Sequence, residues 1–107
     1  MSDKANPIKI AEWATPNNFT HNSAVSDDGK YVFTTDEVTG SYVTSYDVSD
    51  FSNITELDRY QSNPGSNSIA HNTYFLNDYL ITSYYRDGVT IVDASHPNNL
   101  IQVGNYD

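Results

Sequence analysis

The sequence predicts an all-β chain with an internal repeat, on two observations. The first is a segment that ends in an aromatic residue and occurs three times, at 6–13, 53–60 and 99–106. Its closing aromatic residues lie 47 and 46 positions apart, the period of repeats that each make one blade of a β-propeller. The second is a series of short runs rich in β-branched and aromatic residues, without helical periodicity. The expected fold is two four-stranded antiparallel meander blades of a β-propeller, with one extra leading outer strand.

The first repeat follows from the turn residues that divide it. A leading outer strand is expected at 8–13, the first copy of the aromatic-ended segment. The turn at Asp27-Asp28-Gly29 separates two further runs, and Thr39-Gly40 separates the next pair, as a β-meander requires. The expected strands are 21–25, 30–35, 41–47 and 54–60. With their connections, these four strands make a first blade at 14–60.

The second repeat has the same order. Asn77-Asp78 and Asp87-Gly88 are the turns on either side of a run that begins Tyr79-Leu80-Ile81. The expected strands are 69–75, 79–83, 88–93 and 100–106. They make a second blade at 61–107, within a single segment of 1–107. Asp47 and Asp93 end the third strands of the two repeats, and each is expected to form an Asx-type turn with the serine two residues on.

Composition narrows the classes of function. The 14 Asp+Glu against 5 Lys+Arg give a net charge of −9, which repels phosphate and anionic lipid, so neither nucleic-acid partners nor membrane insertion is expected. The absence of cysteine excludes disulfides and thiol chemistry. Charged residues make up 18%, while Tyr, Asn, Ser and Thr are abundant, as in β-rich extracellular proteins. A secreted or cell-surface protein is therefore expected, with the export signal not present in this chain.

Two blades do not close a ring, because propellers generally need four to eight. The expected partners are therefore further copies of the chain, as a homo-oligomer, or the remaining blades of a longer chain. Three copies would supply six blades and four would supply eight.

The two repeats share further motifs. The first contains His21-Asn22 and Tyr46-Asp47-Val48-Ser49, and the second contains Ala70-His71-Asn72 and Ile91-Val92-Asp93-Ala94-Ser95. In these motifs the chain resembles the LVIVD-repeat family, the secreted propeller-like proteins that include the choice-of-anchor B group. The resemblance implies an extracellular or cell-surface propeller, and it implies no catalytic residues.

A candidate site follows from the meander. The start of each first strand and the end of each second strand meet at one edge of the sheet, which in propellers is the usual ligand-binding rim. The main prediction is a non-catalytic binding or scaffold module for a protein, peptide or glycan, without a cofactor. The residues expected to bind this ligand are Asp36, Glu37, Tyr84, Tyr85 and Arg86. The residues expected to have a structural or channel-lining role are His21, Asn22, His71 and Asn72.

Two alternatives use the same residues. Imidazole and carboxylate groups both bind metals and both transfer protons, so His21 and His71 with Asp36 or Glu37 would suit a metal-dependent propeller hydrolase or lyase. A divalent cation such as calcium is the cofactor considered. The second alternative is a purely structural unit that self-assembles into a six- or eight-bladed ring.

Overall fold

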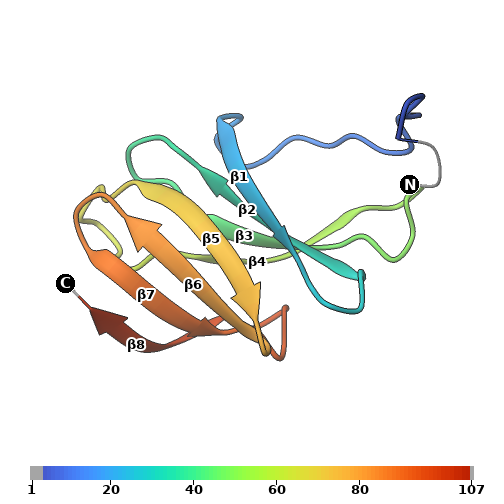
Figure 1. Cartoon of the computed structure of the whole chain (residues 1–107). Helices are drawn as coiled ribbons and strands as arrows, with labels where there is room; N and C mark the ends of the chain where they lie inside the picture. Colours follow the sequence, from blue (N-terminus) through green and yellow to red (C-terminus); the bar gives the residue numbers. More distant parts are fainter. Residues whose placement is uncertain (1–3, 107) are drawn as a thin grey trace.

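The computed structural model describes residues 4–106 and confirms the predicted fold class: these residues form two antiparallel four-stranded sheets and no helix (Figure 1). Sheet 1 has the order β1-β2-β3-β4 and sheet 2 the order β5-β6-β7-β8. The bounds are β1 Thr20–Val25, β2 Tyr31–Asp36, β3 Val43–Asp47, β4 Thr55–Tyr60, β5 Ala70–Leu76, β6 Tyr79–Tyr84, β7 Gly88–Asp93 and β8 Ile101–Tyr106. The predicted ends at 1–3 and 107 lie outside the described residues. No described segment is a helix of the length and apolar character needed to cross a bilayer.

Local turn chemistry explains where the strands end. Asn77 and Asp78 both have positive φ, 50° and 65°, and join Leu76 to its partner Tyr79, so they form a two-residue hairpin of the type that matches strand twist. Gly29 takes φ of 73° in the corresponding turn of sheet 1. The expected Asx turns are confirmed in both repeats.

The predicted leading strand at 8–13 is wrong for this structure, because residues 7–15 pair with no strand. An outer strand of this kind pairs with the third strand of a meander. Both third strands already have partners, β4 on β3 and β8 on β7. Residues 4–10 are exposed, and near the end of the segment the Trp13 ring packs against Tyr46 of sheet 1 with centroids 5.4 Å apart.

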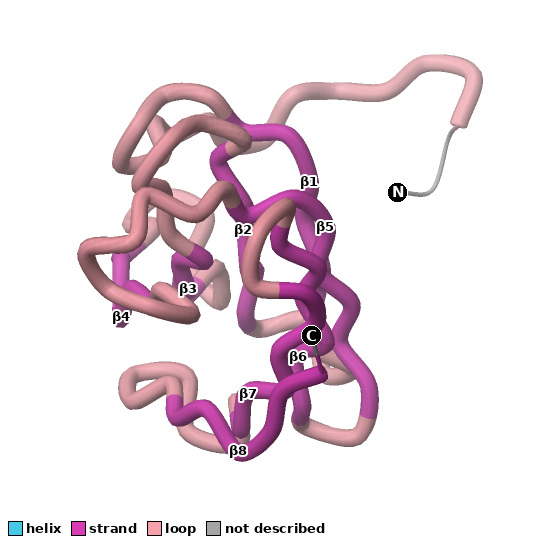
Figure 2. Tube along the Cα trace, turned by 90° about the vertical axis from the view of Figure 1, so that its left-hand side faces the viewer, coloured by secondary structure: helices cyan, strands magenta, loops and turns pink. Residues whose placement is uncertain are grey.

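The hydrophobic core lies between the two sheets. Phe33 and Val43 of sheet 1 and Leu80 and Val92 of sheet 2 are fully buried in one cluster. The Phe33 ring stacks on Phe75, with centroids 5.6 Å apart. Strands β1 and β2 contact β5, and Figure 2 shows β1 and β5 side by side. The first strands of the two repeats therefore form the junction between the sheets.

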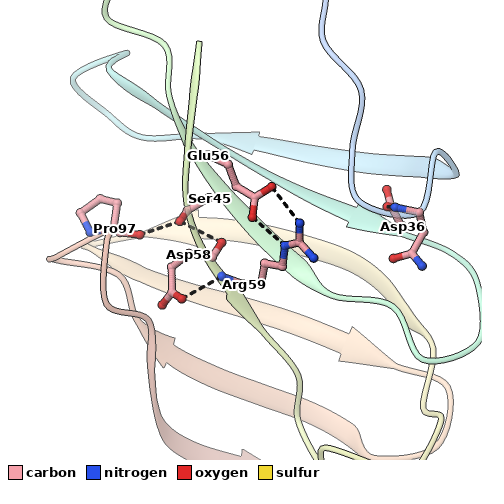
Figure 3. A network of polar contacts seen from close by, with 7 residues as sticks. Asp36, Ser45, Glu56, Asp58, Arg59 and Pro97 are labelled. Carbon is pink, nitrogen blue, oxygen red and sulfur yellow. Dashed lines mark hydrogen bonds and ion pairs between the residues drawn. The ribbon is translucent and has the colours of Figure 1, made fainter.

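Hydrogen bonds join the outer parts of the two sheets. The Ser45 hydroxyl donates to the Pro97 carbonyl at 2.5 Å and lies 3.3 Å from the Asp58 carbonyl (Figure 3). The Asp58 carboxylate accepts from the Leu100 N–H at 2.7 Å. Since each buried polar group needs a partner, these contacts set the position of sheet 2 on sheet 1.

Candidate metal centre between the two sheets

His21 and His71 occupy equivalent β-bulges. In sheet 1, Thr20 pairs with Asp36 and Asn22 with Thr35, so His21 is the extra residue. In sheet 2, Ala70 pairs with Tyr84 and Asn72 with Ser83, so His71 is the extra residue. A bulge leaves one residue out of the ladder and redirects its side chain. Each repeat therefore turns one imidazole toward the junction between the sheets.

Bonds between the sheets hold the two bulges together. The Thr35 hydroxyl donates to the carbonyl of His71 at 2.5 Å. The Asn22 side-chain oxygen accepts from the Thr73 N–H at 2.9 Å, so Asn22 has a structural role between the repeats. The backbone of His71 is thus bonded to sheet 1, and the side chain next to His21 is bonded to sheet 2.

Glu37 lies between the two imidazoles. Its Oε2 atom is 3.3 Å from His21 Nε2 and 3.1 Å from His71 Nε2. The two imidazole rings stack, with centroids 4.6 Å apart and an angle of 18°. The backbone N–H of Glu37 donates to Phe19, which fixes the residue just after the end of β2.

The Glu37 Oε2 atom is buried, and neither imidazole contact has the geometry of a hydrogen bond in this structure. A buried carboxylate oxygen is costly unless a donor or a cation compensates its charge. Around it, the side chains of His21, His71 and Glu37 keep 41%, 32% and 27% of their exposure, so the cluster opens to solvent. The arrangement therefore places a buried carboxylate oxygen between two imidazole nitrogens, within reach of small ions.

The spacing of these atoms fits a metal ion. Ligand atoms at 2.0–2.1 Å from a tetrahedral Zn²⁺ lie roughly 3.3 Å apart. Both nitrogen-to-oxygen distances in the cluster, 3.3 and 3.1 Å, are close to this value. All three candidate ligand atoms lie within 4.8 Å of one another, so an imidazole would have to rotate slightly to complete the set.

Tyr85 borders the open side of the cluster. Its ring lies 5.1 Å from that of His71, and it is 61% exposed. Partial loss of solvent, and then the Glu37 carboxylate, raise the pKa of Tyr85. The N–H of Tyr85 donates to Ile69 as that of Glu37 does to Phe19, so the two residues hold equivalent places in the two repeats.

The five residues predicted to bind a ligand do not form one surface. Asp36 and Tyr84 are 2% and 6% exposed, because they precede Glu37 and Tyr85 on strands whose side chains alternate. The Asp36 carboxylate accepts from the Asn17 N–H at 2.7 Å, and burial raises the pKa of Tyr84. Neither side chain is therefore exposed at the rim in this structure. Arg86 is exposed but bonds the Ser66 carbonyl at 3.3 Å.

Sequence reasoning placed His21, His71 and Glu37 at one rim but did not find the bulges or the bond from Thr35. A bulge has no sequence signal in this chain beyond the repeated His-Asn pair. Asn72, the counterpart of Asn22, is half-buried.

Comparison with known proteins does not extend this picture: no family model, no curated protein and no solved structure matches the chain. The resemblance to LVIVD-repeat proteins stays a prediction from the motifs.

Proposed function

We propose that the chain is a binding module of the β-propeller type that holds one divalent transition-metal ion with His21, Glu37 and His71. The observation that carries the proposal is the buried Glu37 Oε2 atom, which lies 3.3 and 3.1 Å from imidazole nitrogens on equivalent bulges of the two repeats. A cation at this point would satisfy the carboxylate, and it would join His21 and Glu37 of sheet 1 to His71 of sheet 2.

The ligand types select the class of metal. Two imidazole nitrogens and one carboxylate suit Zn²⁺ and its transition-metal neighbours, whereas Ca²⁺ and Mg²⁺ take oxygen ligands. Calcium, the cation considered from the sequence, is therefore the poorer candidate. The net charge of −9 also favours cations over anions.

The exposure of the cluster supports a role in binding as well as in stability. Three protein ligands leave one tetrahedral position open, and such a position binds water or an exogenous group. Tyr85 lies beside His71 with an exposed ring. A carboxylate or imidazole of a protein or peptide ligand could complete the coordination, which agrees with the binding role expected from the rim.

Isothermal titration of the untagged chain with ZnCl₂ tests the proposal. The wild type should bind one ion per chain, and CaCl₂ should give no comparable binding. His71→Ala should weaken Zn²⁺ binding by a factor of roughly 100 or more, since even changes around metal ligands cost 10- to 100-fold.

The third histidine supplies a matched control. His96 is exposed in the loop between β7 and β8, and His96→Ala should bind Zn²⁺ like the wild type. The proposal fails if the wild type binds none of Zn²⁺, Ni²⁺ and Co²⁺, or if His96→Ala weakens binding as much as His71→Ala does.

A further inference from the structure

Each sheet has one face against the other sheet and one face that no sheet covers, which is called its free face although Trp13 packs on that of sheet 1. By strand register, residues on the free face of one sheet are the counterparts of residues on the covered face of the other. On sheet 1, Phe33 and Val43 face sheet 2; their counterparts by strand register are Ile81 and Val89, which lie on the free face of sheet 2. On sheet 2, Leu80 faces sheet 1, and its counterpart is Val32 on the free face of sheet 1. The junction inside the chain is therefore a template for a junction between chains.

Both free faces are apolar enough to pack. A shallow hollow on sheet 2 is lined by Leu76, Tyr79, Ile81 and Ile91. A second hollow, on sheet 1, is lined in part by Val25, Val32 and Trp13. Ile91 is 39% and Val25 55% exposed. Exposed apolar patches of this kind mark interaction sites.

The polar contacts of the internal junction also have counterparts on the free faces. Thr35 donates to the His71 carbonyl, and Ser83 has a hydroxyl at the equivalent position, where it makes two long bonds of 3.3 and 3.4 Å to the Asn72 backbone. Asn22 accepts from the Thr73 N–H, and Asn72 repeats the side-chain amide. Two of the three hydrogen bonds compared between the internal junction and the free faces thus have matching groups on the free faces.

The third contact involves the outer strands. The Tyr60 hydroxyl donates to the Gln102 side chain within the chain. By register, the counterpart of Tyr60 is Tyr106, which is 81% exposed, and the counterpart of Gln102 is Glu56, whose carboxylate is also an acceptor. When sheet 2 of one copy is placed on sheet 1 of another, the Tyr106 hydroxyl therefore faces the Glu56 carboxylate, as a donor facing an acceptor.

We infer that the free face of sheet 2 binds the free face of sheet 1 of a second copy, head to tail, in the arrangement that joins the two sheets within one chain. The contact is heterologous, because different surfaces meet, so it continues from copy to copy and closes when the rotation allows a ring. Closed rings of two to four copies would hold four to eight sheets, the range found in propellers.

The segment before β1 competes for this contact. Trp13 packs on Tyr46 of sheet 1. The counterpart of Tyr46 in sheet 2 is Val92, which lies in the core cluster with Tyr60. Trp13 therefore holds the place that Tyr106 of a second copy would take. Ile8 and Ile10, in the same segment, are 83% and 66% exposed, so little apolar contact resists its displacement. Association is expected to move this segment away from sheet 1.

Association between copies does not require the metal site. A junction between copies would bring His71 and Tyr85 beside His21 of a second copy, without a counterpart of Glu37. The number of ions bound per chain therefore stays at one in the assembly, and association can occur with no ion bound.

Light scattering coupled to size exclusion, over a wide range of protein concentration and with chelator present, is the first measurement. The wild type should change from monomer to a defined larger mass. Ile91→Lys on sheet 2 and Val32→Lys on sheet 1 should each reduce association at least about tenfold, because each would bury an unpaired ammonium group. Ile8→Lys, the same kind of change at an exposed isoleucine of the leading segment, should associate at least as well as the wild type.

A mixture of Ile91→Lys and Val32→Lys tests whether the contact between copies is head to tail. Ile91→Lys keeps an intact sheet 1 face and Val32→Lys keeps an intact sheet 2 face, so a 1:1 mixture should form a heterodimer although neither variant forms a homodimer. Trp13, the only tryptophan, should shift its emission to the red as the complex forms. A chain that stays monomeric at millimolar concentration, or a mixture that restores no dimer, would overturn the inference.

Discussion

Replacing Glu37 by glutamine should separate the stability of the protein from its capacity to bind a metal. The substitution keeps the shape of the side chain and removes its charge. Without metal, the substitution removes the ion pairs of Oε2 with His21 and His71, which are partly exposed, so the free energy of unfolding should fall by no more than about 1 kcal/mol. With metal, the variant lacks the only carboxylate of the three candidate ligands.

The size of the effect follows from linkage between binding and folding. An ion that binds only the folded chain, at a free concentration 100 times its Kd, adds about 2.7 kcal/mol to the free energy of unfolding. For a chain of 107 residues, each kcal/mol moves the Tm by about 4 °C. The wild type should therefore melt about 10 °C higher with Zn²⁺, whereas Glu37→Gln should gain little.

The assay is thermal unfolding followed by circular dichroism, with ZnCl₂ and with chelator. Glu12→Gln is the matched control, since Glu12 is exposed and pairs with Lys9 at 2.7 Å, away from the cluster. It should show the full Zn²⁺-dependent rise in Tm. An equal rise in Glu37→Gln and in the wild type would refute the assignment of Glu37 as a ligand.

Three further predictions concern stability. Thr35→Val should lower the free energy of unfolding by about 1–3 kcal/mol, because it leaves the His71 carbonyl without its donor, and urea unfolding curves that coincide with the wild type would contradict this. Asp78→Gly should raise the free energy of unfolding by up to ~1 kcal/mol in the same assay, since glycine accepts φ of 65° without strain. A lower free energy of unfolding would count against the turn assignment. Ser49 hydrogen bonds lower the pKa of Asp47 in the folded chain, so this stabilisation is present above about pH 4 and is lost as pH falls through the lower folded pKa. Ser49→Ala should therefore be less stable than the wild type at pH 7 and equal to it near pH 2, and a difference that persists in acid would exclude this cause.

Much of the fold could be predicted because its signals are local. The repeat period, the β-branched and aromatic runs and the turn residues each act over a few positions. The predicted strands match β1 to β8 to within about two residues, the usual uncertainty at element ends. Asn77-Asp78 shows the reason: two residues that tolerate positive φ are enough to specify a tight hairpin.

The leading strand could not be predicted in the same way. Residues 8–13 have the sequence of an outer strand, but a strand exists only where a neighbour offers unpaired backbone groups. Within the described chain, β3 and β7 already pair with β4 and β8. The residues of the segment therefore have the pattern of a strand, but neither third strand of the described sheets has an unpaired edge available to pair with them.

Part of the candidate site could be predicted from the sequence, and part depends on the tertiary structure. The sequence by itself determined the two meanders and hence the rim at which His21, His71 and the Asp36-Glu37 pair would meet. Only the tertiary structure decided that Glu37, and not Asp36, lies between the imidazoles. Side chains alternate along β2, so Asp36 is buried at its end, while the residue after it faces the bulged histidines. Bulges and packing between sheets depend on contacts distant in the chain, and no local pattern of residues specifies them.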